Sequence, residues 1–170
     1  MIHIKNISKV YGAAKVLNIE ELNISKGETF GLVGNNGAGK TTLFSLLLDL
    51  IEPSSGSIEI DGIQVNKSED WKGKVSAFID DSFFTPEEYF YFLGELRGQN
   101  RASVDEFLKQ FQDLFNGEIL NAKKYVRDLS KGNQKKVGIV GALIGNPEII
   151  VLDEPFANLD PSTQIKLKNL

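Results

Sequence analysis

A glycine-rich segment that opens a helix restricts the possible folds of this 170-residue chain more than any other feature. Its spacing of glycine, four residues, glycine, lysine and threonine is typical of phosphate-binding loops. The apolar run Phe30 to Val33 predicts a buried strand before it, and residues 42–48 predict a helix after it. The segment consists of Gly34, Asn35, Asn36, Gly37, Ala38, Gly39, Lys40, Thr41 and Thr42. Strand, tight loop and helix in this order indicate a nucleotide-binding loop.

The residue types of this loop suit a triphosphate. Gly34, Gly37 and Gly39 can adopt backbone angles that other residues avoid, so successive N–H groups can point at one anion. A helix that begins near Lys40 adds the partial positive charge of its N-terminus. We expect Lys40 to contact the β- and γ-phosphates and the Thr41 hydroxyl to ligate Mg²⁺. The alternative is a glycine turn followed by a solvated lysine.

The composition of the chain argues against several classes of function. The chain is long enough for one domain with a core, and its 41% apolar and 25% charged residues are ordinary for a globular protein. A net charge of −4 argues against a nucleic-acid partner. The absence of cysteine excludes disulfides and thiolate chemistry. We find no apolar stretch near the ~20 residues of a membrane span and no signal-peptide layout, so a role at a membrane requires a partner.

The N-terminal third predicts a small antiparallel sheet. Apolar residues cluster in strand-like fashion in residues 2–7 and 16–24. Residues 57–65 alternate on both sides of Asp61-Gly62, a dipeptide that suits a type I′ hairpin turn.

The remainder predicts an α/β fold with a helical insertion. Helix-sized segments on both sides of the expected strands 28–33 and 148–152 favour a mostly parallel sheet flanked by helices. Seven of the eleven phenylalanines fall between positions 83 and 115. Thr85-Pro86-Glu87-Glu88 predicts a helix start, and Ser103-Val104-Asp105-Glu106 predicts a second capping box. We therefore place a helical insertion at residues 83–128.

A second candidate site follows the apolar run Ile149 to Leu152, which predicts a strand buried on both faces. Asp153 and Glu154 come directly after it, and ligands bind at the carboxyl ends of such strands. We expect Asp153 to hold Mg²⁺, largely through its water shell, and Glu154 to orient or deprotonate an attacking water. The alternative is a strand that ends in solvated acids.

Four motifs in this order resemble the nucleotide-binding domain of the ATP-binding-cassette (ABC) family. They are the phosphate loop, Leu129-Ser130-Lys131-Gly132-Asn133-Gln134, Asp153-Glu154-Pro155 and Ala157-Asn158-Leu159-Asp160. The resemblance covers essentially the whole chain. It implies a P-loop NTPase core, with a mostly parallel sheet and flanking helices, an N-terminal antiparallel β subdomain and the helical insertion.

The same resemblance implies one ATP-binding domain made of three parts. The antiparallel β subdomain takes residues 1–27 and 56–66, the ATPase core residues 28–55, 67–82 and 129–170, and the helical subdomain residues 83–128.

The resemblance also assigns roles. Gly34 to Thr42 match the Walker A loop, Asp153 the Walker B acid and Glu154 the catalytic carboxylate. Tyr11 occupies the place of an aromatic ring that stacks on adenine in the family. The alternative for Tyr11 is a turn aromatic that covers the edge of the sheet.

Two further motifs imply a dimer. Ser130 and Gly132 match the signature motif, which in this family contacts the γ-phosphate held by the other subunit. Leu159 and Asp160 match the loop that communicates across the dimer. Two nucleotides would then be enclosed between two subunits. The alternative for Ser130, an ordinary helix N-cap, is compatible with this role.

The signature departs from the usual Leu-Ser-Gly-Gly-Gln, because Lys131 replaces a glycine and Asn133 the glutamine. A lysine here resembles a subgroup of exporter-type transporters. Lys131 either adds charge toward phosphate or points to solvent together with Lys135 and Lys136.

A second departure follows the strand expected at Val75 to Ile79. Where the family has a glutamine that contacts Mg²⁺ or water, this chain has Asp80, followed by Asp81. Asp80 is a third candidate metal ligand, and the alternative is a solvated acidic loop.

A third departure concerns a histidine that contacts the γ-phosphate beyond this point in family members. The only histidine of this sequence is His3, and the sequence stops at Leu170. We therefore expect a piece truncated after the motif at Leu159 and Asp160, which binds ATP better than it hydrolyses it.

Taken together, the resemblance implies an ATP-binding and ATP-hydrolysing subunit of a membrane transporter, of the exporter type. Its ligands would be ATP and Mg²⁺. Its protein partners would be a separate transmembrane permease, which the Phe-rich insertion contacts, and a second copy or a paralogous ABC subunit. It would work in the cytoplasm at the membrane face, without nucleic acid. The alternatives are a soluble ABC-type ATPase in translation or DNA maintenance, and a module that senses ATP without turnover.

Overall fold

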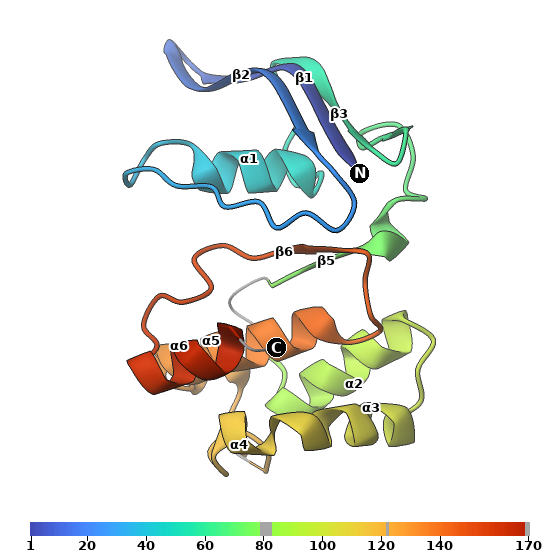
Figure 1. Cartoon of the computed structure of the whole chain (residues 1–170), viewed down its shortest axis with the longest axis vertical. Helices are drawn as coiled ribbons and strands as arrows, with labels where there is room; N and C mark the ends of the chain where they lie inside the picture. The colour runs from blue at the N-terminus through green and yellow to red at the C-terminus, as the bar shows by residue number, and fades with distance from the viewer. Residues whose placement is uncertain (79–82, 122, 169–170) are drawn as a thin grey trace. The chain divides into compact units, whose positions relative to one another are not determined.

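The computed structural model describes residues 1–78, 83–121 and 123–168. The chain forms two compact units, Met1–Gly73 and Lys74–Leu170 (Figure 1). The first unit contains β1 (Ile2–Tyr11), β2 (Ala14–Ile24), α1 (Lys40–Leu47), β3 (Ser55–Ile60) and β4 (Ile63–Gln64), and the short 3₁₀ helix η1 (Lys72–Lys74) spans the division. The second contains β5 (Val75–Ala77), α2 (Pro86–Leu96), α3 (Arg101–Leu108), η2 (Lys109–Phe111), α4 (Gln112–Phe115), η3 (Val126–Asp128), α5 (Lys131–Leu143), β6 (Ile149–Val151) and α6 (Pro161–Lys168).

The first unit is built on the antiparallel sheet that the sequence predicts, with strand order β2-β1-β3-β4. A bulge interrupts β1, where the pairing with β3 shifts between Lys5 and Ser8 and Asn6 has a positive φ of 47°. Because an extra residue resets the alternation of a strand, Ile4 and Ile7 are both buried although they are three residues apart. A Cβ on Gly56 would lie 2.3 Å from the carbonyl oxygen of Asn6, so only glycine fits opposite the bulge.

Helix α1 lies along one face of this sheet (Figure 1). It buries Leu43, Leu46 and Leu47, which the helical repeat places on one side. Leu46 lines a small cavity together with Ile7 and Ile58, so the helix packs directly on β1 and β3.

The predicted hairpin is confirmed. Ile60 pairs with Ile63, and the two residues between them, Asp61 and Gly62, have φ values of 51° and 78°. Two positive φ angles in a two-residue loop are the signature of a type I′ turn.

The strand predicted at Phe30 to Val33 is wrong in this structure. The segment is irregular, and the side chain of Val33 is 95% exposed. In residues 1–78, the ladders of the first unit join only β1, β2, β3 and β4. A strand exists only where a neighbouring strand supplies hydrogen bonds, and apolar character does not provide them.

The only tryptophan, Trp71, belongs to the core of the first unit. Its indole Nε1 donates to the carbonyl oxygen of Val65 at 3.0 Å, so its polar edge is satisfied in a buried setting.

The second unit contains the parallel pair of the predicted α/β fold. Strand β5 pairs with β6 in parallel, with Val75 opposite Ile149. Burial of β6 on both faces was predicted and is wrong within this unit, because Val151 is buried whereas Ile150 is 40% exposed. Side chains alternate along a strand, so only one face of β6 packs against the helices of its own unit.

The helical insertion is present, with one start predicted correctly and one misplaced. Thr85 caps α2 in a full capping box with Glu88, and Pro86 follows at the first helical position. Helix α3 starts earlier than the predicted capping box at residues 103–106. Asn100 caps it instead, since its Oδ1 accepts the N–H of Ser103 at 2.9 Å, and asparagine caps as well as serine.

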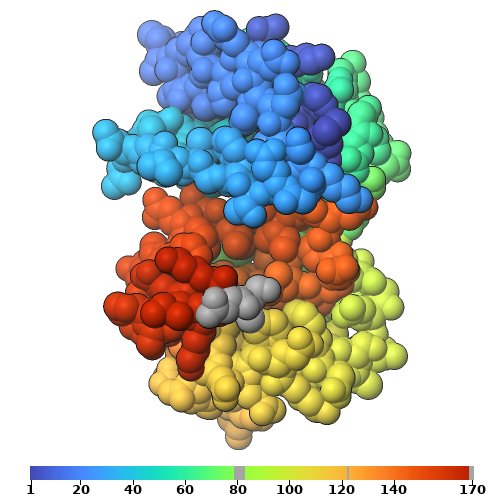
Figure 2. All heavy atoms as spheres, viewed as in Figure 1, coloured from blue at the N-terminus to red at the C-terminus, as the bar shows by residue number. Residues whose placement is uncertain are grey.

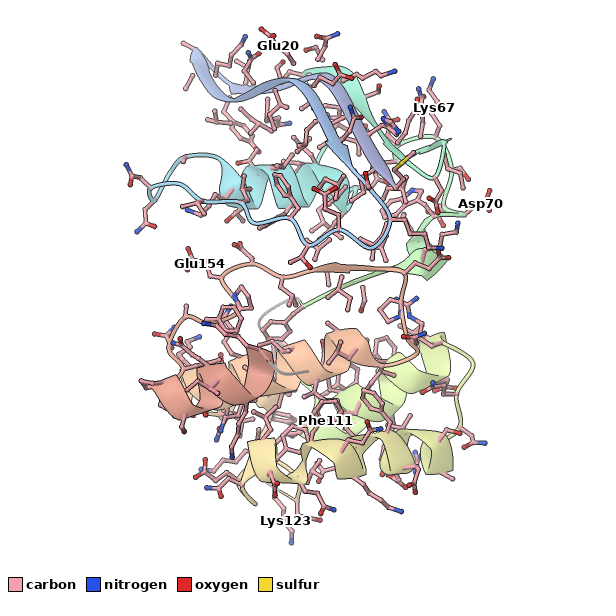
Figure 3. The ribbon with its side chains drawn as sticks, in the orientation of Figure 1. Glu20, Lys67, Asp70, Phe111, Lys123 and Glu154 are labelled. Carbon is pink, nitrogen blue, oxygen red and sulfur yellow. The ribbon has the colours of Figure 1, made fainter. Side chains whose placement is uncertain are left out.

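Helix α5 is central to the second unit and is buried along most of its length. Small residues allow close packing: Phe78 lies against Gly138, and Tyr89 against Gly141. Phe90, Phe111 and Phe115 of the insertion form part of a core beside it, where Phe111 lies among the helices (Figure 3). None of the helices in the described ranges has both the length and the apolar character needed to cross a membrane.

Candidate nucleotide-binding residues

The predicted phosphate loop has a left-handed backbone at two of its glycines. Gly37 and Gly39 have φ values of 82° and 88°, and the N–H of Ala38 donates to the carbonyl of Asn35 at 3.1 Å. The loop also packs closely on β2, because a Cβ on Gly39 would lie 2.6 Å from the carbonyl oxygen of Val16. Gly39 is thus required both for its conformation and for the space it leaves.

Lys40 brings a positive charge to the loop. Its Nζ donates to the carbonyl oxygens of Gly34 at 2.7 Å and Asn35 at 3.1 Å, so the ammonium lies against the loop's own main chain. Helix α1 begins at Lys40, and no side chain caps its N-terminus. The first N–H groups of a helix lack acceptors within it.

The remaining loop residues lie at the surface or just beneath it. Asn36 and Thr41 are exposed, and Thr42 is half-buried at the start of α1. Left-handed glycines, helix N–H groups and one ammonium together form a donor set that suits a polyphosphate. The residues therefore fit ATP at this loop.

Tyr11 ends β1, and its side chain is 52% exposed. Lys9 lies over its ring, with Nζ 5.0 Å from the ring centroid. The ring is therefore available for stacking at the tip of the hairpin between β1 and β2, and its contact with adenine stays a prediction.

In the second unit, Asp153 and Glu154 follow β6, as expected for acids at the carboxyl end of a parallel strand. Asp153 is half-buried, and Glu154 is exposed on the loop after β6 (Figure 3). Glu154 has a positive φ of 47°, a conformation that costs a residue with a side chain about 1–2 kcal/mol. Its carbonyl oxygen accepts the N–H of Ala157 at 3.1 Å, which closes a tight turn. Strain of this kind concentrates at functional sites, which supports a role for this carboxylate.

Lys135 and Lys136, which one of the two alternatives for Lys131 placed in solvent with it, are partly or largely buried. Lys135 is half-buried, and its Nζ donates to the main-chain carbonyl of Asp153 at 2.9 Å. Lys136 is only 9% exposed. Lys131 itself is exposed and donates to Oε1 of Gln134 at 3.1 Å. The contact of Lys135 joins residues 18 positions apart, so no local pattern could have predicted it.

The signature residues lie at the start of α5. Ser130 caps this helix, its Oγ accepting the N–H of Asn133 at 3.2 Å. A Cβ on Gly132 would lie 3.1 Å from the carbonyl oxygen of Asn158, so the first turn of α5 closely approaches the loop that follows β6. Asn133, which replaces the usual glutamine, donates to Oε2 of Glu118 at 3.1 Å.

A polar groove of about 690 Å³ joins these residues to the predicted dimer-communication motif. Ser130 and Gly132 line it together with Leu159 and Asp160. Helix α6, red in Figure 2, lies beside the segment drawn in yellow, which includes α4. Both line the groove, α6 with Ser162 and Thr163 and α4 with Asp113 and Leu114.

Asp160 is held in place by its neighbours on this groove. Its carboxylate accepts hydrogen bonds from the Ser162 hydroxyl at 2.6 Å, the Thr163 hydroxyl at 2.6 Å and the Thr163 N–H at 3.0 Å. These bonds favour the charged form and hold the pKa of Asp160 well below its usual range. Asp160 thereby caps α6, whose first residue is Pro161.

The third metal candidate, Asp80, lies outside the described residues. Among the described residues, no group of three or more His, Asp or Glu side chains is placed to hold a metal ion. Mg²⁺ is commonly bound through one or two carboxylates together with substrate phosphates, and Asp153 offers one such carboxylate.

Comparison with known proteins matches residues 17–157 to the family described as ABC transporter. An uncharacterized ABC transporter ATP-binding protein of Methanocaldococcus jannaschii is 35% identical over 161 residues, which cover 94% of this chain and 58% of the relative. A molybdate/tungstate import ATP-binding protein of Pyrococcus abyssi is 33% identical over 168 residues, which cover 96% of this chain and 48% of the relative. The chain thus spans about half the length of these curated relatives.

Solved structures agree with the fold. A dimeric, post-hydrolysis ATP-binding cassette bound to ADP and Pi superposes with a TM-score of 0.82 at 26% identity, covering 99% of this chain and 80% of the other. The α/β fold with its N-terminal antiparallel subdomain is therefore confirmed.

Proposed function

Because the chain belongs to the ABC transporter family of ATP-binding proteins, we propose that it binds and hydrolyses ATP to power an exporter in the membrane. The observation that carries the proposal is the phosphate loop. Two left-handed glycines, the start of α1 and the Lys40 ammonium bring the donors for a polyphosphate together in one short segment.

Nucleotide binding is assigned to this loop. The N–H groups of residues 34–42 would hold the phosphates, and Lys40 would exchange its contacts with the Gly34 and Asn35 carbonyls for contacts with the β- and γ-phosphates. Tyr11 would add stacking on the adenine ring.

Hydrolysis is assigned to Glu154. A water would attack the γ-phosphorus in line, forming a new P–O bond while the bond to the β–γ bridging oxygen breaks and its electron pair goes to ADP. Glu154 would orient this water and accept its proton at the carboxylate. Lys40 would stabilise the negative charge that develops on the phosphate oxygens.

Thr41, Asp153 and Asp80 are the residues proposed to hold Mg²⁺. When bound, the ion supplies charge neutralisation at the phosphate oxygens. The hydroxyl of Thr41 and the carboxylate of Asp153 are oxygen ligands of the type that Mg²⁺ prefers.

Pairing with a second ABC subunit, either a copy or a paralogue, completes the proposed cycle. The signature residues Ser130 and Gly132 would face the nucleotide held by the other subunit, at the N-terminus of α5. The dimeric cassette with ADP and Pi supports this arrangement by similarity.

An aromatic patch on the helical segment is the proposed contact with the permease. Phe83 is 68% exposed and Arg127 lies 4.0 Å above its ring, while Phe84 stacks on Phe92 with centroids 5.3 Å apart. Tyr125 is exposed beside the same arginine. A cluster of exposed aromatic rings with one cation is typical of protein interfaces.

The direction of transport rests on Lys131, the signature lysine that resembles exporters. Vesicles with the cytoplasmic face outward, containing the permease and this protein, should accumulate substrate when ATP is added. The double variant Phe83→Ser/Phe92→Ser should lose this uptake yet bind ATP normally, because it removes apolar contact area far from the phosphate loop in sequence. Release from preloaded vesicles instead of uptake would indicate an importer.

Lys40→Ala tests the binding step directly. Loss of the ammonium should weaken ATP binding by roughly 100-fold or more, since charge-assisted contacts to phosphate contribute about 3 kcal/mol. Isothermal titration with ATP measures this, and Lys124→Ala, an exposed lysine outside every motif, serves as the control. Equal affinities for Lys40→Ala and the control would refute the loop assignment.

A further inference from the structure

One side chain of α5 touches the ends of both parallel strands. The Nζ of Lys135 donates to the main-chain carbonyl of Asp153, two residues beyond β6, at 2.9 Å. The same Nζ lies 5.9 Å from the ring centroid of Phe78, the residue that follows β5. The carboxyl ends of parallel strands are where ligands bind, so this ammonium is placed beside the expected chemistry.

The surroundings of Lys135 fix its position. Gly138, one turn along α5, leaves space for the Phe78 ring, since a Cβ there would lie 2.2 Å from it. The ring in turn supports the half-buried lysine through a cation–π contact. A hydrogen bond from an ammonium to a carbonyl is stronger than one between neutral groups, so the bond to Asp153 is a firm attachment.

A second contact attaches the same loop to the same side of α5. Gly132 lies three residues before Lys135, and its Cα faces the Asn158 carbonyl so closely that a Cβ would be 3.1 Å away. The loop between Asp153 and Asn158 is therefore hydrogen-bonded to α5 at Asp153 and packed against it at Asn158. It contains Glu154, whose left-handed conformation depends on the surrounding structure.

We infer that Lys135 is a positioning residue that sets the main-chain geometry of Asp153 and Glu154 and couples it to the signature helix. The inference rests on the proposed role of Glu154 in hydrolysis. Ser130 and Lys135 belong to one continuous helix and are about 7.5 Å apart along its axis. A displacement of Ser130 on contact with a partner's nucleotide is therefore passed to the Asp153 carbonyl through a rigid element.

The test compares Lys135→Met, which keeps the length and removes the donor, with Lys135→Arg, which keeps the charge. Lys124→Met is the matched control. In the full-length protein, Lys135→Met should lower kcat roughly 10- to 100-fold, because a small misplacement of a reacting group has effects of this size. The KM for ATP and the affinity for ATP should stay within about twofold, and Lys135→Arg should recover most of kcat.

A kcat in Lys135→Met equal to that of the control would overturn the inference, as would a loss of ATP affinity in parallel with kcat. Amide hydrogen exchange gives a readout that does not need turnover. Exchange at the amides of Glu154, Phe156 and Ala157 should accelerate in Lys135→Met and not in Lys124→Met, and equal protection would also overturn the inference. A wild-type protein that binds ATP without hydrolysing it would refute the proposed catalysis, and the exchange experiment would still decide the role of Lys135.

Discussion

Gly39 and Glu154 both have a left-handed backbone, but the free-energy cost of this conformation differs between them. For Gly39 the conformation is nearly free, whereas for Glu154 it is strained. A strained residue needs support from its neighbours, and the turn closed by the Ala157 N–H provides part of it. The left-handed backbone of the phosphate loop therefore costs little free energy, whereas the loop that carries Glu154 must be held in place by the rest of its unit.

Comparing Gly39→Ala with Gly37→Ala separates the cost of a positive φ from the cost of a steric clash in the phosphate loop. Both place alanine at a positive φ, which should lower the free energy of unfolding by about 1–2 kcal/mol. Gly39→Ala also brings a Cβ to 2.6 Å from the Val16 carbonyl and should lose about 1–3 kcal/mol more, whereas the site at Gly37 is open. Urea unfolding measures both, and equal losses would show that the loop does not pack on β2 as described.

Elements whose signals are local follow the sequence closely. The hairpin turn at Asp61-Gly62 and the capping box of Thr85 and Glu88 each depend on neighbours within a few residues. The glycine loop before α1 belongs to the same class, because its conformation is encoded in its own glycines. These parts of the fold and of the candidate site could be predicted.

Features that depend on distant partners could not be predicted. The run Phe30 to Val33 has strand-like composition, but no pattern in it specifies a neighbouring strand. The partial burial of Lys135 depends on the loop after β6, and the exposure of Ile150 depends on which face of β6 meets the helices. Burial of a charged side chain is a property of the tertiary structure rather than of the local sequence.

The residue that caps α3 can be tested directly. Asn100→Ala should destabilise the protein by about 1 kcal/mol, because it removes the acceptor of the Ser103 N–H. Ser103→Ala should change stability by less than about 0.5 kcal/mol, and Asn100→Asp, which keeps an acceptor, should do the same. Thermal unfolding followed by circular dichroism ranks the three variants. A larger loss in Ser103→Ala than in Asn100→Ala would restore the capping box at residues 103–106.

For the whole molecule, the residues of the proposed ATPase cycle are divided between the two units. The phosphate loop belongs to Met1–Gly73, whereas Asp153, Glu154 and the signature belong to Lys74–Leu170. Neither unit carries the full set of groups, so on our proposal ATP hydrolysis requires both units and a dimer.

In the full-length protein, Glu154→Gln should stop the ATPase cycle with nucleotide still bound. Glutamine keeps the shape of the side chain but cannot accept a proton, so ATP turnover should fall by at least about 100-fold while binding remains. Size-exclusion chromatography with light scattering should show dimers when MgATP is added and monomers when it is omitted. Lys40→Ala/Glu154→Gln should stay monomeric, and turnover at the wild-type rate in Glu154→Gln would remove this residue from its role.

The position of Trp71 gives the protein a native spectroscopic label. Its indole is the single strong ultraviolet fluorophore in the sequence, and it is buried in the unit that carries the phosphate loop. A red shift of its emission will report solvent entry into residues 1–73, whereas far-ultraviolet ellipticity will follow mainly the helices of residues 74–168. Comparing the two transitions in one denaturation will reveal whether the halves melt cooperatively.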